Sequence, residues 1–170
     1  MRKLTAIGIT GVFALGLAAA ALAGDYGGGY GTSTTASASS GSSTKNETYA
    51  FKAALNLAQE VPKPKAPAGA GGTFTAKTVE STSAKTFTWK LTFHGLSGKA
   101  VAAHVHFGKK GVAGAVAIAL CGPCKSGQTG KVKITGKAED AMEGSKAYVN
   151  VHTAKNGAGE IRGQVVLSGK

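Results

Sequence analysis

The chain has few of the residues on which several protein classes depend. Of its 170 residues, two are cysteine, one is tryptophan and eight are acidic. A single CxxC pair has no second pair beside it with which to build a cysteine zinc site. No GxSxG or catalytic Cys–His signature supports a hydrolase. Only the run from Ile7 to Ala20 is long and apolar, so we expect no transmembrane segment after signal cleavage.

Arginine is also scarce, although the chain is basic. There are 20 lysines and arginines against 8 acidic residues, a formal net charge of +12, yet Arg162 is the only arginine after Arg2. Lysine lacks the bidentate reach of arginine, and the lysines are not interleaved with aromatic residues for base stacking. The charge therefore indicates a solvated surface with weak adhesion to acidic polymers or lipid headgroups, and no specific nucleic-acid partner.

The N-terminal region has the pattern of an export signal. Arg2 and Lys3 precede the apolar run, and Ala21-Leu22-Ala23 forms a cleavage pattern before Gly24. The next residues are rich in Gly, Ser and Thr and carry too few aliphatic side chains to form a core. We therefore expect a secreted or periplasmic protein with a signal peptide over 1–23, a flexible linker over 24–48 and a folded domain over 49–170.

From residue 49 onward apolar and polar residues alternate, as in strands with one buried face. The run KTFTWKLTFHGL gives the clearest example, with four large apolar side chains on one face: Phe87, Trp89, Leu91 and Phe93. About eight such runs, the last of them over residues 160–169, are separated by Gly, Pro, Asn and Ser turns. They predict an all-β fold, an antiparallel β-sandwich with Greek-key connections. Only residues 137–146 suggest a helical turn.

The two cysteines form the sequence CGPC, the spacing of a thioredoxin-type redox site. Such a site needs Cys121 at the start of a long helix, whose dipole lowers the pKa of the thiol. Here CGPC is followed by turn and strand signals, so we expect Cys121 and Cys124 to form a small disulfide in a loop between strands. Redox catalysis and metal binding are the alternatives.

We expect the four histidines to lie on the polar, outward and more solvent-exposed faces of their strands. His104 and His106 are two residues apart and share a face, and His152 shares a face with Asn150. An H-x-H pair with a third histidine from a neighbouring strand is a chelating arrangement for copper or zinc. The alternative is that these histidines only form hydrogen bonds within the scaffold. Glu160 is the one candidate carboxylate to support them from the C-terminal strand region.

Three motifs together resemble those of the CHRD (chordin-type) domain family. They are Gln59-Glu60-Val61-Pro62, Ala103-His104-Val105-His106, and the closing pair Tyr148–Thr153 and Gly159–Gln164. The resemblance covers about residues 49–170. It implies an immunoglobulin-like or superoxide-dismutase-like β-sandwich in an exported protein whose molecular activity is generally unassigned. The CGPC loop is not part of the family pattern.

A fainter similarity is to the copper–zinc superoxide dismutases, which have a Greek-key sandwich, a His-Val-His strand, a later copper histidine and a C-terminal arginine. Matching residues occur here in the same order: His104, His106, His152 and Arg162. The bridging histidine and the zinc ligands are missing, and His94 lies on the wrong side of the H-x-H pair to replace the bridge. The catalytic pair of metals therefore cannot be assembled as in that family. The similarity leaves open a lone copper site, to which Arg162 would attract small anions.

Two functional hypotheses follow. The first is a non-enzymatic structural or binding module at the cell envelope, with an extracytoplasmic partner or a surface polymer. The second is a copper- or zinc-binding protein that uses His104, His106 and His152 and has superoxide-related chemistry. Asn150, Glu160 and Arg162 would support such a site. No nucleophile–base–orienter set is evident, so we predict no catalytic residue.

Overall fold

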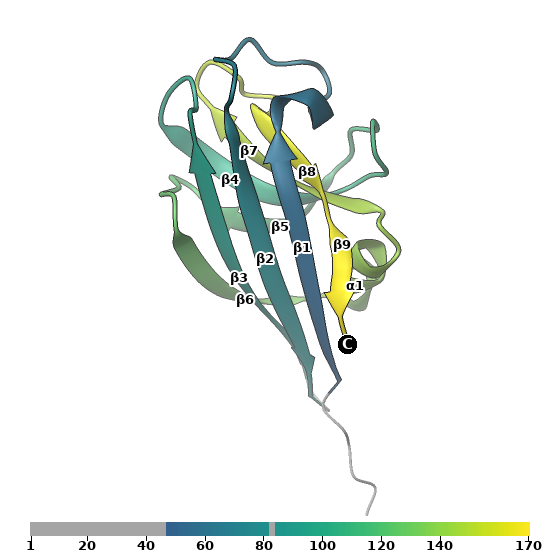
Figure 1. The fold of residues 1–170 in the computed structure, drawn as a ribbon. Coiled ribbons are helices and arrows are strands. Elements are labelled where there is room, and N and C mark those ends of the chain that lie inside the picture. The colour runs from purple at the N-terminus through teal and green to yellow at the C-terminus, as the bar shows by residue number, and fades with distance from the viewer. Residues whose placement is uncertain (1–46, 82–83) are drawn as a thin grey trace, which may run out of the picture. The chain divides into compact units, whose positions relative to one another are not determined.

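Two layers of antiparallel strands make up the computed structural model, which describes residues 47–81 and 84–170 (Figure 1). The first sheet contains, in spatial order, β6 (Gln128–Ile134), β3 (Lys85–His94), β2 (Gly71–Glu80), β1 (Thr48–Asn56) and β9 (Val166–Gly169). The second contains β5 (Val116–Cys121), β4 (Ala100–Phe107), β7 (Ala147–Thr153) and β8 (Ile161–Gln164). β8 also pairs with β1, at Arg162 and Asn56, so the nine strands form one continuous sheet folded into two layers, which are called here the first and the second sheet. The predicted all-β sandwich is confirmed. The proposed signal peptide and almost all of the proposed linker lie outside the described residues.

The connections between the sheets have the expected Greek-key form. β1, β2 and β3 pair in sequence, and the chain then crosses to β4 in the second sheet. β6 returns to pair with β3, and β7 pairs with β4. Strands distant in sequence therefore become neighbours, as in other Greek-key folds.

The sequence run 160–169, which we expected to be one strand, is two. β8 pairs with β7 in the second sheet, while β9 pairs with β1 in the first. The change of sheet occurs at Val165, which is fully buried and whose amide donates to the Ala147 carbonyl oxygen at 2.9 Å. The described residues thus contain nine strands where about eight were expected.

The core lies between the two sheets and contains the inward side chains of both. From the first sheet come Phe51, Phe74, Phe87, Trp89 and Leu91, and from the second Val105, Val149, Val151 and Ile161. The alternation seen in the sequence therefore separates core from surface as predicted. Burying one such side chain stabilises the fold by about 1.5–3 kcal/mol.

The predicted helical turn is a short helix, α1 (Gly136–Glu143), between β6 and β7. Thr135 caps its first turn by accepting a hydrogen bond from the Ala138 amide. Met142, fully buried, joins this helix to the core. A 3-10 turn, η1 (Leu57–Gln59), follows β1. None of the helices among the described residues has the length and apolar character needed to cross a membrane.

Three loops cover the outer face of the second sheet and bury polar residues beneath them. The loop after η1 is joined to the loop after β7, because Lys65 and Asn156 exchange backbone–side-chain hydrogen bonds of 3.1 and 3.2 Å. The β4–β5 loop is joined to β8, since Arg162 donates to the carbonyl oxygens of Lys109 and Val112 at 3.0 and 2.9 Å. These loops determine the environment of the candidate site.

Candidate metal centre

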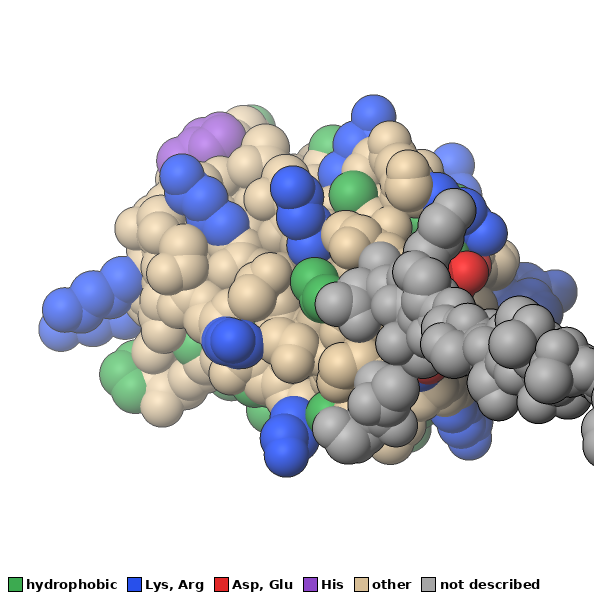
Figure 2. Space-filling view, turned by 90° about the horizontal axis from the view of Figure 1, so that it is seen from below, with side chains coloured by type: hydrophobic (Ala, Val, Ile, Leu, Met, Phe, Trp, Pro, Cys, Tyr) green, Lys and Arg blue, Asp and Glu red, His purple; other side chains and the backbone are tan. Residues whose placement is uncertain are grey.

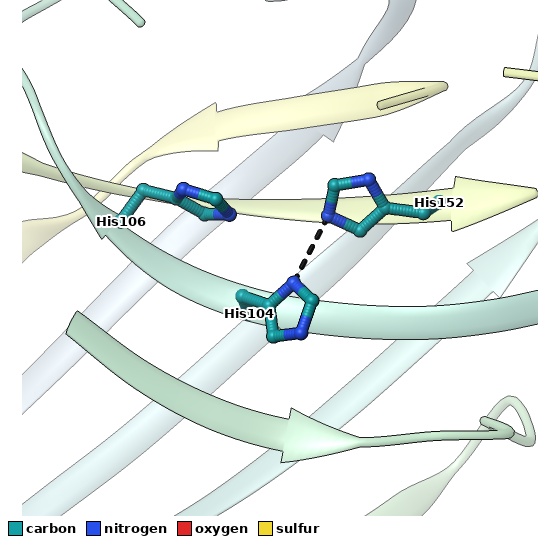
Figure 3. A group of neighbouring side chains, drawn as sticks. All are labelled: His104, His106 and His152. Carbon is teal, nitrogen blue, oxygen red and sulfur yellow. Dashed lines mark hydrogen bonds between the residues drawn. The ribbon is translucent and has the colours of Figure 1, made fainter. Parts of the chain in front are cut away.

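The structure brings His104, His106 and His152 together on the outer face of the second sheet (Figure 3). The pairing of β4 with β7 sets Asn150 opposite His104, so His152, two residues further along β7, is a diagonal neighbour of His104. One ring nitrogen from each histidine lies within 4.8 Å of the others. His94, at the end of β3, is exposed and is not part of this group.

Backbone carbonyls fix the tautomers of two of the three rings. The Nδ1 atom of His106 lies 2.9 Å from the Gly114 carbonyl oxygen, and Nδ1 of His152 lies 3.0 Å from that of Gly157. A carbonyl only accepts, so both Nδ1 atoms donate and both Nε2 atoms carry a lone pair. Metal-binding histidines are commonly oriented by such a bond from the second nitrogen.

The Nε2 atoms of His106 and His152 differ in their hydrogen bonding. Nε2 of His152 accepts from Nδ1 of His104 at 3.1 Å, the bond drawn in Figure 3. Nε2 of His106 is buried and has no hydrogen-bond partner of normal geometry, although the Asn150 side chain lies close enough to favour the protonated ring. A buried acceptor without a partner costs free energy, and a metal ion beside it would remove that cost.

The histidines are less exposed to solvent than their positions on outward strand faces suggested. They point away from the core between the sheets, as predicted, but His106 and His152 are each only 9% exposed. The expectation of a wet face is therefore wrong for these two, because the loops cover them. Burial lowers the pKa of His104, His106 and His152 below the ordinary value, which keeps the rings neutral near pH 7.

An aromatic–cation stack lies next to the cluster. His106 stacks on Tyr148 with ring centroids 5.0 Å apart and an angle of 10° between the planes. The guanidinium carbon of Arg162 lies 3.3 Å from the Tyr148 ring centroid. Arg162 is 1% exposed, so it packs beneath the loops as an anchor and presents no charge to solvent.

Glu160 lies within the β7–β8 loop and organises it. Its carboxylate accepts from the amide and hydroxyl of Ser97 at 2.5 and 2.6 Å, from Thr153 at 2.5 Å and from Asn156 at 2.9 Å. Burial alone would raise the pKa of Glu160, but these hydrogen bonds outweigh it and hold the pKa below the ordinary value. Glu160 thereby shapes the loop whose Gly157 carbonyl orients His152, and bonds to no histidine itself.

Asn150 connects the histidine strands to a second buried carboxylate, that of Glu60. Asn150 donates to the Ala158 carbonyl oxygen at 3.4 Å. Gly159, at φ +134°, leaves room for both side chains, since a Cβ there would lie 2.6 Å from Glu60 and 2.7 Å from Asn150. Burial raises the pKa of Glu60 to about 7, although the Asn150 side chain and the Arg162 charge favour the carboxylate.

Sequence reasoning assigned no role at this site to Glu60 or Tyr148. Glu60 is charged, yet it is 3% exposed, and Tyr148 is 3% exposed. The available signal was their place in the motifs QEVP and YVNVHT, which come to one face of the sheet. On that face, side chains from the three motifs together form one polar layer.

The CGPC segment lies away from this layer, after β5. Cys121 and Cys124 are joined by a disulfide with Cα atoms 5.2 Å apart. No helix follows them, because the chain turns at Lys125 and enters β6 at Gln128. The structural context that a thioredoxin-type site requires is therefore missing at this loop.

A family model supplies the classification of this chain. The model of the CHRD domain matches residues 51–165. The chain belongs to the CHRD family. The matched range extends from β1 through β8 and includes every residue of the histidine cluster and the Glu60–Arg162 layer. No curated protein and no solved structure matches the chain.

Proposed function

We propose that this CHRD-family protein is exported and binds one copper or zinc ion through His104, His106 and His152. The observation that carries the proposal is the buried Nε2 lone pair of His106, which has no hydrogen-bond partner and belongs to a group of three imidazole nitrogens. Imidazole nitrogen is a preferred ligand for both metals. The donor set is Nδ1 of His104 with Nε2 of His106 and of His152.

The protonation states of the three rings favour metal binding. A ligating imidazole must be neutral, and burial lowers the pKa of each ring. Only His104 has to change tautomer, because its Nδ1 proton now bonds to His152. That proton would move to Nε2 of the same ring, and the metal ion would take the place that the proton now holds between His104 and His152.

The half-buried position of His104 also bears on chemistry at the metal. His104 is the most exposed of the three rings, and metal sites that react keep one coordination position open to a small molecule. We include superoxide among the small molecules to be tested with the copper-loaded protein. A metal-free role as an envelope module remains the competing hypothesis, with the rings acting as hydrogen-bonded scaffold.

Export is supported by two independent features. The first 23 residues have the charge, apolar run and cleavage pattern of a signal peptide. The disulfide between Cys121 and Cys124 is a bond that persists in oxidising compartments. Secretion or residence in a periplasm is accordingly part of the proposal.

Calorimetric titration of the purified protein with zinc and copper tests the metal site. We expect one ion per chain with sub-micromolar affinity, together with a higher unfolding temperature in the presence of metal. The triple variant H104A/H106A/H152A loses this binding. The variant H94A is the matched control, because it removes an exposed histidine outside the cluster and should bind like the parent.

Two results would defeat the proposal. One is a parent protein that binds neither metal above background. The other is metal binding that survives in the triple variant or disappears in H94A.

A further inference from the structure

The outer face of the first sheet carries an array of lysine and threonine. Five exposed lysines project from four strands: Lys52 on β1, Lys77 on β2, Lys90 on β3, and Lys131 and Lys133 on β6. The apolar side chains that alternate with these polar residues along the strands, such as Phe74 and Phe87, point inward. Five of the lysines scattered along the sequence are thus collected on one surface, here called the lysine face.

The strand register keeps the lysines of this face apart. Thr75 lies opposite both Lys52 and Lys90, and Thr88 lies opposite both Lys77 and Lys131. Neighbouring strands are about 4.8 Å apart, so two lysines in one such row are separated by about 10 Å. No lysine of these two rows lies directly opposite another, an arrangement that avoids destabilising like-charge pairs. Each row alternates a cation with a hydroxyl group.

Acidic residues do not compensate this charge. Among the described residues of β1, β2, β3 and β6, the single acidic one is Glu80 at the end of β2, and it forms an ion pair of 3.2 Å with Lys85. The surface seen in Figure 2, from below, likewise carries many lysine side chains and little acidic area. Four of the lysines and their threonines line a shallow groove of about 730 Å³.

We propose that the lysine face binds an acidic polysaccharide, a linear polymer with carboxylate groups, in this groove. The cations pair with the carboxylates, and the threonine hydroxyls, which both donate and accept, match the hydroxyls of the sugars. The spacing of lysines along each row suits a polymer that carries charge at intervals and crosses several strands. This proposal does not depend on the metal site, which lies on the other sheet.

Other polyanions fit this face less well. Single-stranded nucleic acid is held by aromatic stacking, and the aromatic side chains of β2 and β3, including Trp89, point into the core. Sequence readout uses arginine forks, whereas this face offers lysine. Interfacial membrane binding uses buried apolar side chains, and the one large apolar side chain exposed on these four strands is Val79, at 39%. The lysine face offers cations and hydroxyl groups but no stacking aromatic side chain, and this combination favours a sugar polymer.

Affinity electrophoresis and calorimetry with polygalacturonate, at low salt, test the proposal on the purified protein. The face variant is K52Q/K77Q/K90Q/K131Q. The control variant, K63Q/K110Q/K146Q/K155Q, removes the same charge from exposed lysines elsewhere. We expect the face variant to bind at least about tenfold more weakly than the parent and the control variant to change by less than about twofold, because close cations dominate attraction to a polyanion.

The result is decided by comparison of the variants and probes. Equal losses in both variants would mean attraction to net charge alone and would overturn the proposal, as would a parent that does not bind. Tighter binding of single-stranded DNA, or of phosphatidylglycerol vesicles, than of polygalacturonate would overturn the choice of polymer. Matching unfolding temperatures of both variants and the parent show that any loss arises at the surface.

Discussion

At the residue scale, one buried nitrogen distinguishes the two explanations of the histidine cluster. A scaffold made only of hydrogen bonds satisfies its members, and His104 and His152 do pair with one another. His106 is different, because its Nδ1 proton is committed to Gly114 and its Nε2 atom is left without a partner in the interior. The ring therefore keeps a lone pair free, as a metal ligand does, although the neighbouring Asn150 also has a buried oxygen without a partner.

Glu60 gives a prediction at the same scale. Its pKa is about 7 in the folded protein against an ordinary value of 4.5. The folded state then binds more protons than the unfolded state between these values, so this group makes stability fall as pH rises from about 4.5 to about 7. The variant E60Q is neutral at all pH values and lacks that loss.

Urea unfolding at pH 5 and pH 8 measures this effect. We expect E60Q to gain stability relative to the parent on going from pH 5 to pH 8. Comparing the two proteins cancels the histidines, whose lowered pKa values act in the opposite direction in both. A stability difference that is the same at both pH values would show that Glu60 ionises normally.

At the element scale, the loop between β7 and β8 links the fold to the site. Glu160, fully buried, accepts four hydrogen bonds that hold this loop, and the Gly157 carbonyl within it orients His152. The loop is therefore set by a carboxylate that touches no histidine.

The variant E160Q tests this role. An amide presents its NH₂ group to donors, so hydrogen bonds are lost and we expect destabilisation by about 1–3 kcal/mol. The lowered pKa of Glu160 means that its contribution is present at neutral pH and is lost as pH falls through the folded-state pKa. Metal affinity should fall as well, because His152 loses its orienting carbonyl.

The matched control for this loop is E143Q on α1. Glu143 forms a surface ion pair of 3.6 Å with Lys170, and such pairs contribute about 0–1 kcal/mol. Chemical denaturation and zinc titration of both variants give the comparison. If E160Q were as stable and bound metal as tightly as E143Q, the loop would not depend on Glu160.

The elements also show which parts of the structure were predictable from sequence. Alternation in runs such as KTFTWKLTFHGL predicted the strands and their buried faces, because a half-buried strand requires period two. The split at Val165 was not predictable from that pattern, since the change of sheet depends on where β1 and β7 lie. The burial of His106 and His152 was missed for a similar reason. The loops that cover them are rich in Gly, Pro and Lys, and hydrogen bonds such as Lys65–Asn156 place them.

At the scale of the whole molecule, the two proposed sites lie on the outer faces of different sheets. The lysine face belongs to β1, β2, β3 and β6, and the histidine cluster belongs to β4 and β7. The core between them is closed by apolar side chains from both sheets. A polymer could therefore be bound on one side without covering the metal site on the other, and substitutions in one site should leave the other intact.

The most direct test of the central claim is a crystal structure of zinc- or copper-loaded protein with diffraction measured at the absorption edge of the metal. We expect one anomalous peak bonded to Nδ1 of His104 and to Nε2 of His106 and His152, at about 2.0–2.1 Å for zinc. The hydrogen bond between His104 and His152 would be replaced by the metal. A cluster without a peak that keeps that hydrogen bond would contradict the account, and the three histidines would then be scaffold.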